Sequence, residues 1–138
     1  MRHRFIVLLA GLWWGSLTSL GFWIVPLLFY YLPSSSVAGS LAGQLFKSQT
    51  WVSLLCTLLM LLILRLEPVG RPLFIRRNLS LNFWILTGLL LAFIGEFVVA
   101  PQIIGREKLQ FWHNVGSSIF IVQWICSTVV FWSCSRTK

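Results

Sequence analysis

Four long apolar runs, separated by short polar segments, constrain this chain more than any other feature of its sequence. They cover about residues 5–31, 50–65, 81–104 and 109–133. Runs of this length are typical of helices that cross a hydrocarbon core of about 30 Å. Only 10% of the residues are charged, against about 25% in soluble domains. The sequence therefore predicts one membrane domain over residues 1–138, an all-α integral membrane protein built as a bundle of four transmembrane helices.

The start of the second helix is open to two interpretations. The hydroxyls of residues 34–36 can cap a helix, and Val37, Leu41 and Leu45 then recur at helical spacing. Residues 36–48 therefore form either an interfacial helix or the beginning of the second span.

Two prolines lie inside the spans. Pro26 and Pro101 are expected to bend the first and third helices, because a proline removes a backbone donor and crowds the preceding turn. The strings that lead to them are similar, Phe22-Trp23-Ile24-Val25-Pro26 in one case and Phe97-Val98-Val99-Ala100-Pro101 in the other. This echo indicates either a parallel duplication of two helices or a chance similarity between apolar strings.

The basic residues predict the orientation. Cytoplasmic segments of membrane proteins carry an excess of Lys and Arg. Eight lie at the termini and between the second and third spans (Arg2, Arg4, Arg65, Arg71, Arg76, Arg77, Arg136 and Lys138), whereas three lie in the other connections (Lys47, Arg106 and Lys108). We therefore expect both termini to be cytoplasmic, in a multi-pass protein of the bacterial cytoplasmic (inner) membrane.

The composition excludes several kinds of chemistry. All three acids are glutamates (Glu67, Glu96 and Glu107), so a Ser-His-Asp triad is excluded and an acidic magnesium cluster is not expected. The net charge of +8 comes from residues that flank the spans, so no nucleic-acid partner is expected. The three cysteines form no CxxC pair. We expect no cofactor and no enzymatic activity, and the sequence assigns no metal ligands.

Small residues predict the faces on which the helices meet, because close approach drives helix packing in lipid. On a helical wheel, Gly11 and Gly15 share one side of the first span with Thr18, Ser19 and Phe22. In the third span, the stripe consists of Gly88, Ala92, Gly95 and Glu96. The opposite sides, rich in Leu, Ile, Phe and Trp, are expected to face lipid.

Glu96 is the most informative polar residue, because an ionised carboxylate inside a membrane costs about 2.5–3.5 kcal/mol or more. His113 in the fourth span lies at a comparable predicted depth, so a contact with Glu96, direct or through water, is plausible. Ser117 and Gln123 share the side of His113, and Asn114 or Ser117 can bond to Glu96. This polar intramembrane site is either an ion-binding or protonatable site or a structural bridge that fixes the helix register.

Several strings resemble the bacterial membrane family related to transmembrane protein 205, a domain of unknown function (4149). They are Gly15-Ser16-Leu17, Val25-Pro26-Leu27-Leu28-Phe29 and residues 38–46, followed by residues 95–101 and 111–118. The resemblance implies four membrane helices and no established reaction. Members often have glycine where this chain has Asn114, which affects how closely the fourth helix packs there.

A more distant similarity is to four-helix membrane protoporphyrinogen oxidases and copper-resistance membrane proteins, which have glycine and Pro-x-x-Phe in the first helix. In that oxidase family, a histidine of the first helix is important. This chain has none within residues 5–31, which counts against haem chemistry.

Three functions fit these observations. The leading hypothesis is a non-enzymatic protein that binds or passes a small solute or ion through the polar site, as a homo-oligomer if it transports. The second is an interaction or accessory subunit that lies in the lipid bilayer and has no chemistry of its own. The third is a cofactor-dependent membrane oxidoreductase.

Overall fold

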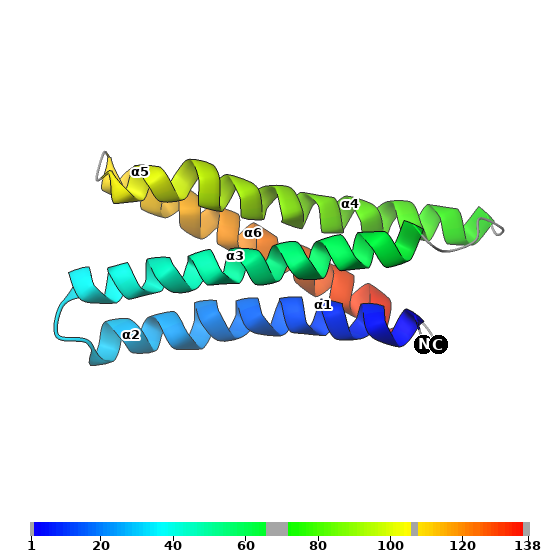
Figure 1. The fold of residues 1–138 in the computed structure, drawn as a ribbon, viewed down its shortest axis with the longest axis horizontal. Coiled ribbons are helices and arrows are strands. Elements are labelled where there is room, and N and C mark those ends of the chain that lie inside the picture. Colours follow the sequence, from blue (N-terminus) through cyan, green and yellow to red (C-terminus); the bar gives the residue numbers. More distant parts are fainter. Residues whose placement is uncertain (1, 66–71, 106–107, 137–138) are drawn as a thin grey trace.

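The computed structural model describes residues 2–65, 72–105 and 108–136, and these residues are helical apart from short turns (Figure 1). The first membrane helix comprises α1 (Arg2–Ser19), the π-helix η1 (Leu20–Ile24) and α2 (Val25–Tyr31). The second is α3 (Ser35–Arg65). The third comprises α4 (Pro72–Ile94), η2 (Gly95–Val99) and α5 (Ala100–Ile104), and the fourth is α6 (Leu109–Ser135).

Four helical segments are long and apolar enough to cross a membrane. They are His3–Tyr31, Ser35–Arg65, Leu79–Ile103 and Gln110–Ser135. Most large apolar side chains outside the core are exposed, as expected of surfaces that face lipid tails. The chain is therefore a multi-pass membrane protein.

Residues 36–48 are part of α3 and continue without a break into the second span. Ser34 precedes the helix and caps it, because its Oγ accepts a hydrogen bond of 3.3 Å from the Val37 backbone N–H. Its carbonyl oxygen accepts a second bond, of 3.1 Å, from the Ala38 N–H. The sequence left two arrangements open here, and the structure has the continuous helix.

Both chain termini lie at the same end of the bundle (Figure 1). We call this the terminal end; Arg4, Arg65 and Arg136 lie there, near the ends of their helices. The opposite end, here the far end, carries the connection 32–34 and Gly105. The cytoplasmic location of the termini stays a prediction.

The two prolines follow the same backbone irregularity. The Val25 N–H donates to the carbonyl of Leu20, and the Ala100 N–H donates to the carbonyl of Gly95. Each bond spans five residues and so belongs to a π-turn, which ends two residues before the proline. Wider turns of this kind accompany helix distortion, as does proline itself.

The first and second membrane helices share the spacing of their buried residues with the third and fourth. Buried residues of the first helix recur 75 residues later in the third: Ile6, Ala10, Trp13 and Leu17 correspond to Leu81, Ile85, Gly88 and Ala92. Buried residues of α3 recur 70 residues later in α6: Ser53, Cys56, Thr57 and Met60 correspond to Gln123, Cys126, Ser127 and Val130. Any two helices that each bury one face share this spacing, so the parallel duplication and the chance similarity both stay open.

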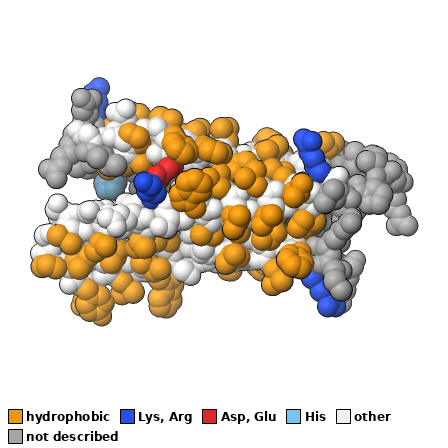
Figure 2. Space-filling view, in the orientation of Figure 1, with side chains coloured by type: hydrophobic (Ala, Val, Ile, Leu, Met, Phe, Trp, Pro, Cys, Tyr) orange, Lys and Arg blue, Asp and Glu red, His pale blue; other side chains and the backbone are white. Residues whose placement is uncertain are grey.

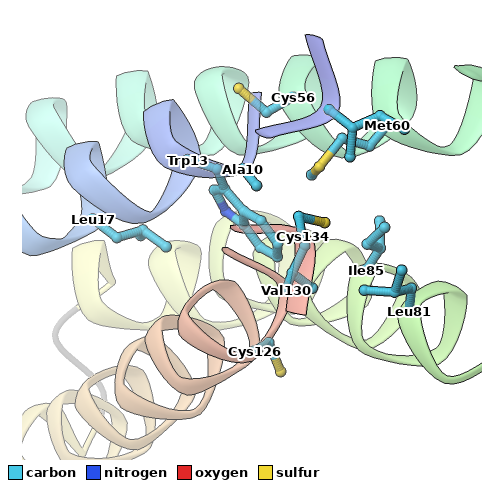
Figure 3. Packing of buried hydrophobic residues seen from close by; sticks show 11 residues of the cluster. Ala10, Trp13, Leu17, Cys56, Met60, Leu81, Ile85, Cys126, Val130 and Cys134 are labelled. Atoms are coloured by element: carbon cyan, nitrogen blue, oxygen red, sulfur yellow. The ribbon is translucent and has the colours of Figure 1, made fainter. Parts of the chain in front are cut away.

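The apolar core fills the half of the bundle nearer the terminal end (Figure 3). Its centre is Trp13, which is fully buried, and the indole ring lies over Gly88 of α4. An added Cβ at Gly88 would lie 2.5 Å from Cη2 of that ring. Trp13 of the first helix therefore packs on Gly88, which lies 75 residues later in the third helix.

The expectation that tryptophan and leucine of the first span face lipid is wrong for Trp13 and Leu17, which are both fully buried. In the predicted small-residue stripe of the first span, a Cβ added at Gly11 would lie 3.3 Å from the Phe131 ring. A Cβ added at Gly15 would meet no atom within 4 Å. In the third span, Ala92 is buried and Gly95 lies near Ile119. The Trp13 side of the first helix is buried because Gly88, a member of the predicted stripe of the third span, provides the space that the indole ring needs.

Candidate functional site

A buried polar network crosses the bundle next to Trp13, and Ser53 of α3 is its centre. The Ser53 Oγ lies 3.2 Å from the Trp13 Nε1 of α1 and 3.2 Å from the Gln123 Nε2 of α6. The amide of Gln49, one turn away on α3, lies 3.4 Å from the same oxygen and donates to the Ser16 Oγ at 2.9 Å. The side chains of Ser53, Gln49 and Gln123 are all at least 92% buried. Three of the four membrane helices are therefore joined through one hydroxyl.

The chemistry of a hydroxyl decides how these contacts are shared. A serine oxygen accepts at most two hydrogen bonds and donates one. The 3.2 Å contacts from Trp13 and Gln123 are the shorter two and fill its acceptor sites, whereas the Gln49 amide donates at 2.9 Å to Ser16. The Ser53 oxygen then accepts its full number of hydrogen bonds, as a polar group at this depth requires.

A second connection extends the network toward the far end. The Trp124 Nε1 of α6 donates to the Thr18 Oγ1 of α1 at 2.9 Å, and that hydroxyl donates to the Trp14 carbonyl at 2.8 Å. Thr57, one turn beyond Ser53, donates back to the Ser53 carbonyl at 2.7 Å. The Trp124–Thr18 bond joins the first and fourth helices, whereas the Thr57 bond stays within α3.

The structure separates the five residues of the predicted polar site into two groups. Gln123 belongs to the buried network. The other four, Glu96, His113, Asn114 and Ser117, lie nearer the far end, and none of them bonds to a described residue of the network. The predicted site is therefore not one cluster.

Glu96 lies in the π-helix η2 and is half-buried. Among the described residues, it forms no hydrogen bond and no ion pair. Glu67 and Glu107 lie outside the described residues, so Glu96 is the single acid in the described part of the chain. An intramembrane carboxylate without a bond to another described residue is a candidate site for an ion or a proton.

The side chains of His113, Asn114 and Ser117 are exposed, and their bonds stay within α6. The Ser117 Oγ donates to the His113 carbonyl at 2.9 Å, and the Gln110 amide donates to the Asn114 Oδ1 at 3.3 Å. No direct bond joins Glu96 to His113. The direct contact expected from the sequence is thus absent, and a contact through water stays a prediction.

The surface is hollowed at the far end, between the segment of α3 nearest the far end and the α5 region (Figure 2). A histidine lies in this hollow, and an acidic side chain lies next to a basic one on the same face. Polar residues of α3, including Gln44 and Lys47, are exposed at this level. We call this region the far-end hollow; the exposed or half-buried polar residues toward this end of the helices include Gln44, Lys47, Glu96, Gln110, His113, Asn114 and Ser117.

Two aromatic rings separate the far-end hollow from the buried network. Phe46 and Phe120 meet edge to face, with ring centroids 5.3 Å apart. They lie one turn closer to the far end than Gln49 and Gln123, respectively. Gly21 leaves room for the Phe120 ring, since an added Cβ there would lie 2.6 Å from its Cζ. On α3 and α6, this ring pair therefore lies between the polar residues toward the far end and the buried network.

The residues of the network other than Gln123 escaped the sequence analysis. A signal was present, because Gln49, Ser53 and Thr57 place a polar side chain at every fourth position of an otherwise leucine-rich helix. Nothing in the sequence showed that Trp13 would join them. Within residues 2–65, 72–105 and 108–136, no group of three His, Cys, Asp or Glu side chains is placed to hold a metal ion.

The family profile described as Domain of unknown function (DUF4149) matches residues 8–111. The chain belongs to this family. The DUF4149 match includes Trp13, Gln49, Ser53 and Glu96, and it ends before His113. Comparison with curated proteins and with solved structures gives no match.

Proposed function

We propose that this DUF4149 protein binds a small ion or polar solute in the far-end hollow and passes it across the membrane. The observation that carries the proposal is Glu96, a half-buried carboxylate within a candidate span and without a bond to another described residue. A charge in this position is costly unless water, an ion or a ligand solvates it.

The surroundings of Glu96 support the same role. Four exposed polar side chains of α6, those of Gln110, His113, Asn114 and Ser117, lie at the far end of a candidate membrane span. Polar groups in spans normally line a water-filled cavity or face other protein groups. The predicted orientation opens this hollow away from the cytoplasm, in a bacterial inner membrane.

The closed parts of the bundle limit how passage can occur. The Phe46–Phe120 pair and the apolar core around Trp13 lie between the hollow and the terminal end. Passage therefore requires the helices to separate there, or a path between copies in a homo-oligomer. The proposal involves no covalent step and no cofactor.

Replacing Glu96 with glutamine tests this function. The change keeps the size of the side chain and removes its charge. In proteoliposomes with a trapped pH-sensitive dye, a K⁺ gradient and valinomycin, we expect K⁺ exit to drive proton entry through the wild-type protein, with entry at least tenfold slower through Glu96→Gln. Glu67→Gln makes the same chemical change between the second and third spans and is expected to retain the wild-type rate.

Two results would count against ion passage. One is a wild-type rate no higher than that of protein-free liposomes. The other is an unchanged rate in Glu96→Gln at equal reconstitution. Either result, with normal folding, would favour the accessory-subunit alternative, for which Gly15 offers an open face on the first helix.

A further inference from the structure

An apolar groove runs along the lipid-facing surface between α3 and the third membrane helix. It has a volume of about 560 Å³ and is lined by Trp51, Leu54, Leu55 and Leu58 of α3, by Phe93 of α4 and by Phe97 of η2. Five of these six side chains are exposed. The groove therefore offers a continuous apolar bed between two helices, which suits a hydrocarbon chain.

Two opposite charges lie at the end of the groove that is nearer the far end. Lys47 is exposed and lies one helical turn before Trp51, on the same side of α3. Glu96 is the residue before Phe97 and lies three residues after Phe93. Figure 2 shows an acidic side chain beside a basic one at the edge of the orange apolar surface.

The two charges do not neutralise each other directly. No ion pair within 4.0 Å joins Lys47 or Glu96 to another described residue. Each is therefore available to a ligand group of the opposite charge. A phosphate suits the ammonium group of Lys47, and an ammonium suits the carboxylate of Glu96.

The depth of these residues fits a lipid head group. At 1.5 Å per residue, Lys47 lies about 27 Å along α3 from Arg65, close to the thickness of a hydrocarbon core. With Arg65 at one membrane boundary, Lys47 is at the other. The groove residues Trp51 to Leu58 then extend from that boundary about 6–17 Å into the membrane.

We propose that the groove and the Lys47–Glu96 pair form a binding site for a phospholipid with a primary ammonium group. One acyl chain lies along the groove, the phosphate meets Lys47, and the ammonium meets Glu96. A purely anionic head group fits less well, because it would meet the Glu96 carboxylate. This inference goes beyond the proposed function but shares Glu96 with it, so a lipid ammonium and a passing cation would compete for the same carboxylate.

The test is native mass spectrometry of the purified full chain after exchange into nanodiscs of phosphatidylethanolamine, phosphatidylglycerol or phosphatidylcholine. We expect bound phosphatidylethanolamine to exceed either of the others at least fivefold. Lys47→Gln should lower that bound fraction at least fivefold. Leu58→Trp, which fills the groove, should do the same, whereas Leu62→Trp, one turn further along the same exposed side of α3, should retain the lipid.

Equal retention of the three lipids, or a preference for phosphatidylglycerol, would overturn the proposal. So would retention of phosphatidylethanolamine by both Lys47→Gln and Leu58→Trp at the wild-type level. Lipid retention without any ion flux would leave this inference standing and count against the proposed function alone. Ion flux without selective lipid retention would overturn this inference and leave the proposed function standing.

Discussion

Ser53→Ala is expected to lower the free energy of unfolding by about 2–3 kcal/mol, because it leaves buried polar groups of three helices without their shared partner. Trp13 loses the acceptor of its indole N–H, at 3.2 Å, and Gln123 loses its side-chain bond to another described residue. Gln49 keeps its bond to Ser16. The hydroxyl itself is small, so lost packing contributes little to the expected effect.

The effect of Ser53→Ala is measured by reversible unfolding from mixed micelles with increasing SDS, followed by circular dichroism. Ser48→Ala is the matched control on the same helix. Its hydroxyl is exposed and bonds only to the Gln44 carbonyl, at 3.1 Å, so a change within about 0.5 kcal/mol is expected. If the two variants unfold alike, the network does not stabilise the bundle.

Gly88→Ala is expected to destabilise the bundle by about 1–3 kcal/mol through overpacking. In most helices the same change stabilises by about 0.5–1 kcal/mol. At Gly88, however, the new Cβ would lie 2.5–2.6 Å from two atoms of the Trp13 ring. That ring cannot yield easily, since it is fully buried and hydrogen-bonded to Ser53.

The control for Gly88→Ala is Gly15→Ala, where an added Cβ meets no atom within 4 Å. This variant should be as stable as the wild-type protein or slightly more stable in the same assay. Trp13→Phe provides a double-mutant cycle, because phenylalanine lacks the outer part of the indole ring. The Gly88→Ala cost should shrink in the Trp13→Phe background by at least 0.5 kcal/mol; strictly additive costs would refute the ring-on-glycine contact.

The number of helices follows from the sequence because apolar run length alone determines it. The runs ending near Tyr31, Arg65, Ile103 and Ser135 are long enough to span a membrane whatever their neighbours are. The echo before Pro26 and Pro101 was also visible, and it marks two π-turns with the same i to i−5 bond. Which face of each helix is buried was harder to predict.

The burial of Trp13 shows why the faces were harder to predict. A helical wheel ranks residues by size and polarity, and on that basis a tryptophan belongs in lipid. Its burial depends on Gly88, 75 residues away, and on an acceptor at Ser53. The same holds for the polar site: Gln123 shares a side with His113 in the sequence, but its partner is Ser53 of α3 rather than a residue near Glu96.

We expect the far-end hollow to contain water and to end on the far-end side of the buried network. Ser117 and Ser127 lie on the same helix, the first exposed and the second fully buried, and each can be replaced by cysteine. The three native cysteines are buried, and labelling of the protein without an added cysteine gives the background rate. In proteoliposomes treated with a charged, water-soluble maleimide, Ser117→Cys should react at least tenfold faster than Ser127→Cys, which should stay at background. Equal, slow labelling of both would show that lipid rather than water covers Ser117, and would contradict the account.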